Sequence, residues 1–193
     1  MSERQTAKPP THATRLVVNR SSRRGAPIQA IAVHSTESSD IKASWDDLKS
    51  VGNWFNTSAA QASSHIGIDG DGHSSRWVPD DEKAWTILQL NDRTLNIEFV
   101  GRAAQPRDDW EAAQIKTGAR WAAYWAIKFG LPIQLGAVKN INGAPVISRK
   151  GIIRHSDLTA AGFGSHTDPG PNFPMREFLE NAQWYRRNGW YLN

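Results

Sequence analysis

Three segments of the sequence carry residues that could together hold a metal ion. His34 ends the apolar run IQAIAV, His155 ends a second short apolar segment, and Asp168 lies in the run His-Thr-Asp-Pro-Gly. Two imidazoles and a carboxylate suit a catalytic zinc ion, which takes three protein ligands and keeps one position open. The sequence has no cysteine, so any metal must be held by such groups. No HExxH motif is present, and separate structural or surface histidines are the alternative interpretation.

Two further residues could take part in hydrolysis beside such an ion. Glu98 lies among apolar residues in the segment TLNIEFVG, where burial would raise its pKa and suit it to act as a general base. The alternative is a surface acid on an edge strand. His166, two residues before Asp168, could donate a hydrogen bond to a developing oxyanion; the alternative is a surface histidine in a loop.

The hydrophobic pattern predicts the elements that position these residues. Apolar and alternating runs predict strands at 16–19, 28–34, 94–101 and 151–155, and the Asp-Gly turn at 71–72 predicts a β-hairpin between 63 and 79. Helical spacing predicts helices at 44–54, 108–129 and 175–187, the second ending at Gly130. Strands and helices alternate without an internal repeat. This indicates an α/β or mixed α+β fold, with a central mixed β-sheet flanked by helices.

Composition limits the class of protein. The chain has 193 residues, 39% of them hydrophobic and 22% charged, and a mean hydropathy of −0.56. These values predict a globular protein with one domain at 15–193, after a flexible basic arm at 1–14 that contains Pro9-Pro10. We expect no transmembrane segment, because no apolar run approaches the roughly 20 residues that span a bilayer. The start of the chain also lacks the apolar stretch of a secretory signal.

The net charge of +4 is concentrated at the start of the chain. Residues 1–24 carry six basic side chains against one acidic side chain, and the remainder is nearly neutral. The sequence also lacks a phosphate-binding glycine loop. We therefore expect no nucleic-acid partner, although a basic arm of this kind can hold a chain to an anionic surface.

Several motifs together resemble the zinc-dependent N-acetylmuramoyl-L-alanine amidases of the type-2 amidase and peptidoglycan-recognition-protein superfamily. They are VHST, SSHIGIDGDG, WVPDDEKAW, LNIEFVG and RHSDL with HTDPGPNFP, and they span residues 28–180. The resemblance implies that zinc is bound by His34, His155 and Asp168, and that Glu98 is catalytic. His166 occupies the oxyanion-stabilising position, where the family usually has lysine. The segment AAYWAIKFG is similar to lysins from phages of actinobacteria.

The resemblance also implies a cleft wall with substrate-binding residues. Trp77 and Trp85 flank the segment that borders the cleft in the family, where an aromatic face can stack on a sugar ring; packing in the core is the alternative. We count His65 among the substrate-binding residues and expect it to support the sheet or the cleft wall rather than to bind zinc. Three further tryptophans on the long helix are expected in the core: Trp110, Trp121 and Trp125.

The implied function is hydrolysis of peptidoglycan at the amide bond between N-acetylmuramic acid and the first L-alanine of the stem peptide, with a zinc-activated water as nucleophile. The expected setting is the catalytic domain of a phage or prophage endolysin. Such a protein would be monomeric, made in the host cytoplasm and released to the cell wall through a holin-type pore. The alternatives are a peptidoglycan-recognition module without catalysis and a bacterial amidase of cell-wall recycling.

Overall fold

A computed structural model describes residues 8–38 and 45–189. Its strands are β1 (Ala13–Thr14), β2 (Arg20–Ser22), β3 (Ala30–Ser35), β4 (Ile66–Ile68), β5 (Ser74–Arg76), β6 (Glu82–Ala84), β7 (Thr94–Phe99), β8 (Ala137–Ile141), β9 (Ala144–Arg149) and β10 (Gly151–Arg154). The helices are α1 (Trp45–Phe55), α2 (Ala112–Phe129), α3 (His155–Ala160) and α4 (Met175–Asn188), with 3-10 turns η1 (Leu88–Leu90) and η2 (Arg107–Asp109).

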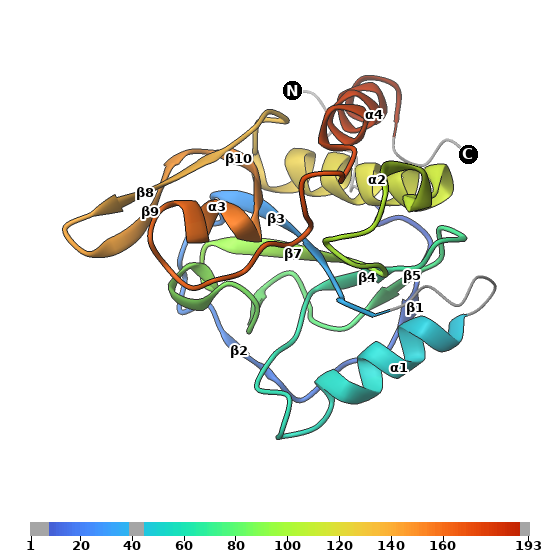
Figure 1. Cartoon of the computed structure of the whole chain (residues 1–193), viewed down its shortest axis with the longest axis horizontal. Helices are drawn as coiled ribbons and strands as arrows, with labels where there is room; N and C mark the ends of the chain where they lie inside the picture. Colours follow the sequence, from blue (N-terminus) through green and yellow to red (C-terminus); the bar gives the residue numbers. More distant parts are fainter. Residues whose placement is uncertain (1–7, 39–44, 190–193) are drawn as a thin grey trace, which may run out of the picture.

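A six-stranded mixed sheet forms the centre of the molecule, in the order β1-β5-β4-β7-β3-β10 (Figure 1). The four strands β4, β7, β3 and β10 are parallel, whereas β5 runs antiparallel to β4. Every residue of β3 and β7 is buried, as expected for apolar runs in the middle of a sheet. The predicted central mixed sheet with flanking helices is therefore confirmed.

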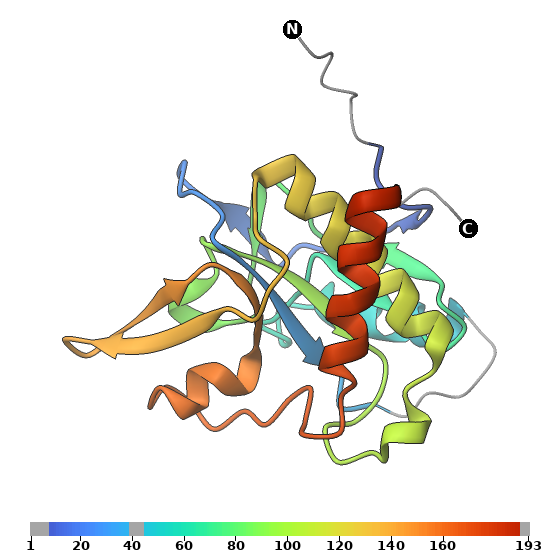
Figure 2. The same ribbon diagram turned by 90° about the horizontal axis from the view of Figure 1, so that it is seen from above.

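Helices cover both faces of this sheet. α2 and α4 lie side by side over one face, and α1 lies against the other (Figures 1 and 2). The larger core lies beneath α2 and α4 and includes the three tryptophans that were expected there, Trp110, Trp121 and Trp125. Successive side chains of a strand point to opposite faces. Ile31 and Val33 of β3 face this core, so His34 points to the other face.

Most of the predicted helix ends agree with the structure, but α2 begins at Ala112 and not at residue 108, because residues 107–109 form the separate 3-10 turn η2. Gly130 ends α2 in the left-handed conformation, with φ of 66°, and its N–H donates to the carbonyl of Ala126. α4 begins at Met175 as expected. The predicted start of the first helix at Ser44 lies outside the described residues.

Several predicted elements need correction. Residues 16–19 form no strand; the strands nearby are β1 and β2. The residues directly after β10, for which no helix was predicted, form the helix α3. A second hairpin, β8 and β9, was not predicted, and it projects from the body of the molecule (Figure 2).

The flexible arm predicted at 1–14 is also wrong in its boundary. Residues 1–7 lie outside the described part, but β1 pairs in parallel with β5 and forms one edge of the central sheet. The carbonyl of Thr11 accepts a hydrogen bond from the Ser74 hydroxyl at 2.9 Å. The ring of His12 packs edge-on against buried Trp121, with ring centroids 5.2 Å apart.

Among the helices that the structure describes, none combines the length and apolar character needed to cross a bilayer.

Candidate metal centre and active site

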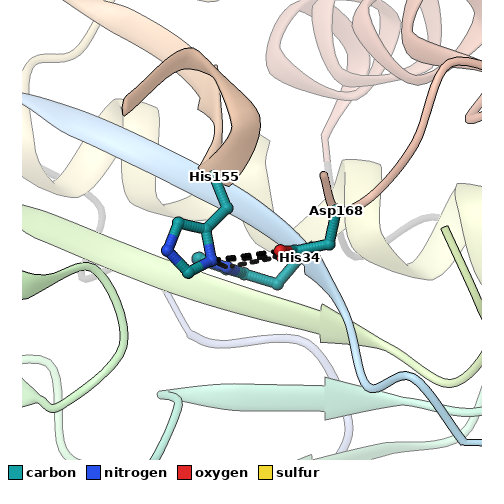
Figure 3. A group of neighbouring side chains, drawn as sticks. All are labelled: His34, His155 and Asp168. Carbon is teal, nitrogen blue, oxygen red and sulfur yellow. Dashed lines mark hydrogen bonds and ion pairs between the residues drawn. The ribbon is translucent and has the colours of Figure 1, made fainter. Parts of the chain in front are cut away.

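The three predicted metal-binding residues meet at one edge of the sheet (Figure 3). His34 lies near the carboxyl end of β3, and His155 directly follows β10, which pairs in parallel with β3. Parallel neighbours end at the same edge of a sheet, so the two histidines lie next to each other. Asp168 comes from the loop between α3 and α4, and its main-chain carbonyl accepts a hydrogen bond from Ser156 N–H at 3.0 Å.

The donor atoms of this group have the spacing of a metal coordination shell. The Nδ1 atoms of His34 and His155 are 3.2 Å apart, and Asp168 Oδ2 lies 3.2 Å from the first and 3.3 Å from the second. A tetrahedral zinc ion with bonds of about 2.0–2.1 Å separates its ligand atoms by about 3.3–3.4 Å. All three residues are buried. The donor set and its spacing therefore fit zinc.

The loop that carries Asp168 is held by a close backbone contact. Gly170 has a φ of +88°, and a Cβ atom added there would lie 1.9 Å from the carbonyl oxygen of Ala103. The N–H of Ala103 in turn donates to Glu37 Oε1 at 2.9 Å. Glu37 follows β3, and Ala103 follows β7. Three loops around the metal-binding group thus meet at Ala103.

Glu98 lies beside this group in the interior of the sheet. Its Cα is paired with that of His34 across the β3–β7 ladder, and its side chain is buried. Burial raises the pKa of Glu98 well above its usual value, and the nearby charges of Asp168 and Glu37 add to this effect. β7 is a central strand, so Glu98 is not the surface acid of an edge strand. A carboxyl group with a raised pKa is suited to accept and return a proton near neutral pH.

A cleft of about 310 Å³ opens onto Glu98. The end of β3 contributes Ser35 and Thr36 to its lining, and α1 contributes Val51 and Trp54. Trp54 is 54% exposed. The sequence analysis did not single out Trp54 as a residue of the cleft. A helix with aromatic residues at both 54 and 55 cannot bury both on one narrow stripe, and this was the available signal.

His166 lies against the metal-binding group from outside. Its ring stacks on that of His155, with centroids 3.8 Å apart and an interplanar angle of 15°, and its side chain is 54% exposed. Its Nδ1 atom lies 3.4 Å from Asp168 Oδ1. Partial burial lowers the pKa of His166, and the charge of His155 lowers it further. The lowered pKa favours the uncharged ring at neutral pH, and an uncharged ring has one N–H donor.

Two of the predicted substrate-binding residues are buried, and these predictions are corrected. Trp77 has no exposed surface; its ring fills the space above Gly67 and Gly52 and meets Phe55 edge to face. It cannot stack on a sugar. His65 is likewise fully buried, and burial followed by the charge of Arg23 lowers its pKa well below the usual value. It therefore does not lie in a cleft wall.

Trp85 is half-buried, and its indole N–H donates to the Ser21 hydroxyl at 3.0 Å. The expectation that it binds substrate stays a prediction.

A protein-family model described as N-acetylmuramoyl-L-alanine amidase matches residues 24–171. The search of curated protein sequences returned no match.

Similar solved structures include the hydrolase AmiA from Staphylococcus aureus, solved with its ligand. It is 19% identical, with a TM-score of 0.66 over 94% of this chain and 87% of that chain. The structure of an AmpD derivative is 18% identical, with a TM-score of 0.63 over 88% of this chain and 93% of that chain. The endolysin amidase LysCS from Clostridium intestinale is 17% identical, with a TM-score of 0.60 over 92% of this chain and 98% of that chain. At these identities the likeness concerns the fold alone.

Proposed function

Because the chain belongs to the N-acetylmuramoyl-L-alanine amidase family, we propose that it is a zinc-dependent peptidoglycan hydrolase. The bond cleaved is the amide between N-acetylmuramic acid and the L-alanine of the stem peptide. The observation that carries this proposal is the convergence of two imidazole nitrogens and one carboxylate oxygen within 3.3 Å of one another. This group lies beside Glu98, which is buried and lines an open cleft.

In this proposal His34, His155 and Asp168 hold the zinc ion. When bound there, zinc supplies a Lewis acid that polarises the amide carbonyl and lowers the pKa of water. Glu98 accepts a proton from the attacking water and returns it to the nitrogen of the leaving alanine. The raised pKa of Glu98 supports both halves of this transfer, because a carboxyl group that titrates nearer to neutral pH can exist in either form during turnover.

His166 is assigned to the oxygen of the scissile carbonyl. As water attacks, that oxygen gains negative charge, and an N–H donor placed beforehand stabilises it. The stacking of His166 on His155 fixes the plane of the ring. Its uncharged state at neutral pH makes the hydrogen bond weaker than one from the lysine usual in the family.

The cleft on Glu98 is assigned to the substrate. Trp54 gives this cleft an exposed aromatic face, which can pack on a sugar ring or on apolar atoms of the stem peptide. Trp85 is retained as a second binding residue.

The setting that we propose is the catalytic domain of a phage or prophage endolysin, which reaches the wall from the host cytoplasm by holin-type release. The fold shared with the endolysin LysCS over almost the whole of both chains supports this setting. The fold shared with AmpD keeps a cell-wall recycling amidase as the second candidate. A recognition module without catalysis is disfavoured, because binding alone needs neither a complete ligand set nor a buried glutamate beside it.

The test is digestion of purified peptidoglycan by the protein as isolated, after treatment with a chelator, and after zinc is restored. New N-terminal alanine amines that vanish on stripping and return with zinc support the proposal, whereas new reducing sugar ends contradict the assigned bond. The variant Glu98→Gln should bind zinc as the wild type does but lose about 10²- to 10⁴-fold in rate. Protein that sediments with the wall but releases no amines with or without zinc would favour the recognition module.

A further inference from the structure

A chain of buried polar residues lies behind His34, on the side away from the metal-binding atoms. Asn96 of β7 is two residues before Glu98, so its side chain points to the same face of the sheet as those of Glu98 and His34. Its amide oxygen lies 3.1 Å from His34 Nε2. On its other side Asn96 meets His65, and all three residues are buried.

We propose that Asn96 and His65 are positioning residues that hold His34 in the one tautomer able to bind a metal through Nδ1. This inference rests on the zinc site of the proposed function. An amide oxygen only accepts hydrogen bonds, so His34 Nε2 must carry the ring proton and donate it. A neutral imidazole has one such proton, so the lone pair of Nδ1 is directed at His155 and Asp168.

The neighbours of Asn96 decide which way its amide is turned. Its Nδ2 atom lies 3.4 Å from both Thr94 Oγ1 and His65 Nδ1. The Thr94 hydroxyl donates its own proton to the Leu90 carbonyl at 3.0 Å, so it presents a lone pair to the amide. His65 Nδ1 accepts the main-chain N–H of Asn96 at 3.1 Å and is therefore unprotonated. Two acceptors on this side require the NH₂ group there, and the oxygen is left for His34.

His65 is in turn fixed by its surroundings. With Nδ1 as acceptor, its proton lies on Nε2, which is 3.1 Å from the carbonyl oxygen of Glu82. Arg23 Nη2 also approaches Nε2, at 2.6 Å, and competes for that nitrogen. The guanidinium and the main-chain N–H both only donate, and a neutral ring can accept from only one of them. Two partners, the main-chain N–H of Asn96 at Nδ1 and the Glu82 carbonyl at Nε2, require the proton on Nε2, and they set the tautomer of His65.

Because His34, Asn96 and His65 are buried, losing one of their hydrogen bonds should weaken metal binding. Asn96 and His65 have no exposed surface and His34 is only 1% exposed, so water cannot replace a lost partner there. Partners that orient a ligating histidine from behind typically contribute 10- to 100-fold to metal affinity. We expect a loss of that size when the acceptor on Asn96 is removed.

The experiment compares three variants of the full chain. Asn96→Leu removes the acceptor at similar volume, and Asn96→Asp keeps an acceptor for His34. The matched control is Gln114→Leu, which removes another buried amide; Gln114 donates to the main-chain oxygens of Ile68 and Val100 and contacts no proposed ligand. Zinc dissociation constants are measured by competition with a chromogenic chelator. The tautomer of His34 is read from ¹H–¹⁵N correlation spectra of the zinc-free protein, because bound zinc would itself impose the Nε2–H form.

We expect the wild type to show the Nε2–H tautomer, and Asn96→Leu to show a mixture and to bind zinc 10- to 100-fold more weakly. Asn96→Asp should keep most of the affinity, and Gln114→Leu should lose stability but not zinc affinity. The Nδ1–H tautomer in the zinc-free wild type would overturn the inference without any variant. So would an unchanged zinc affinity in a folded Asn96→Leu variant, or an equal loss in Gln114→Leu.

None of these measurements involves peptidoglycan. A wild type that has the expected tautomer and binds zinc, but does not cut peptidoglycan, would refute the proposed function and leave the role of Asn96 intact. A wild type that cuts peptidoglycan, with an Asn96→Leu variant that binds zinc normally, would refute the role of Asn96 and leave the proposed function intact.

Discussion

Replacing Gly170 by alanine should damage the metal site without touching any proposed ligand. Gly170 has a φ of +88°, and its alanine Cβ would lie 1.9 Å from the carbonyl oxygen of Ala103. Real Cβ contacts are not shorter than 3.0 Å, so the two backbone segments must separate by at least about 1 Å. Functional groups need to be held within about 0.5 Å of their working geometry. Asp168, two residues away, should therefore leave its place beside His34 and His155.

The expected loss of stability in Gly170→Ala has two parts. An L side chain with positive φ costs about 1–2 kcal/mol, and forcing extra volume into a packed site costs about 1–3 kcal/mol. The free energy of unfolding should thus fall by about 2–5 kcal/mol. Zinc affinity should fall by at least about tenfold, because the loss of a fixed ligand exceeds the smallest effects of orienting partners.

The hairpin turn provides a matched control. Gly143 has a φ of +80°, but nothing lies within 4 Å of the Cβ position there. Gly143→Ala should carry only the backbone cost and bind zinc as the wild type does. Unfolding in denaturant and zinc competition titration measure the two quantities. If Gly170→Ala binds zinc as tightly as Gly143→Ala, the contact with Ala103 does not position Asp168 and the reasoning is wrong.

Four further predictions concern side chains in and below the site. Trp54→Ala should raise KM about 2- to 10-fold at unchanged kcat, because stacking on the substrate is lost. Trp77→Ala should lower the free energy of unfolding by about 3–5 kcal/mol, because its ring is buried. An unaltered KM in the first variant, or an unaltered stability in the second, would contradict these assignments. His166→Ala should lower kcat by about 10²- to 10³-fold with zinc affinity unchanged, and a parallel loss of zinc would show that His166 acts only through its neighbours. The folded pKa of His65 lies well below the usual value, so below pH 6.5 the unfolded chain binds a proton that the folded chain does not. Because of this proton, the free energy of unfolding should fall by about 1 kcal/mol for each unit of decreasing pH. Denaturant unfolding at pH 6 and pH 5 measures this fall, which should be smaller in His65→Gln than in the wild type.

The parts of the fold that could be predicted are those set by local pattern. The apolar run before His34 and the alternation around Glu98 place β3 and β7 correctly, because a buried strand needs only its own residues to be recognised. The Asp-Gly turn likewise predicted the hairpin of β4 and β5. Asn142-Gly143 is an equally strong turn signal between β8 and β9. That hairpin was missed because its flanking residues are largely exposed and lack a clear apolar face.

Burial of single aromatic and polar residues could not be predicted in the same way. Whether Trp77 faces solvent depends on the space left by Gly67 on β4 and Gly52 on α1, and these glycines come from elements that meet only in the folded chain. His65 shows the same limit, because its partners Arg23 and Asn96 come from distant segments. The metal-binding residues were easier, since His34 and His155 end neighbouring parallel strands. The contact of Gly170 with Ala103 has no sequence signal, because the two residues meet only in the folded chain.

The pairing of β1 with β5 bears on how this protein tolerates shortening. The first residues look dispensable by composition, yet β1 covers the outer edge of β5 in the central sheet. A chain that began after Thr14 would leave the outer edge of β5 without its pairing partner β1. An uncovered strand edge pairs readily with the same edge of another molecule. Trimming the start of the chain would therefore promote self-association, although the residues removed lie at the opposite edge of the sheet from β10 and the metal-binding group.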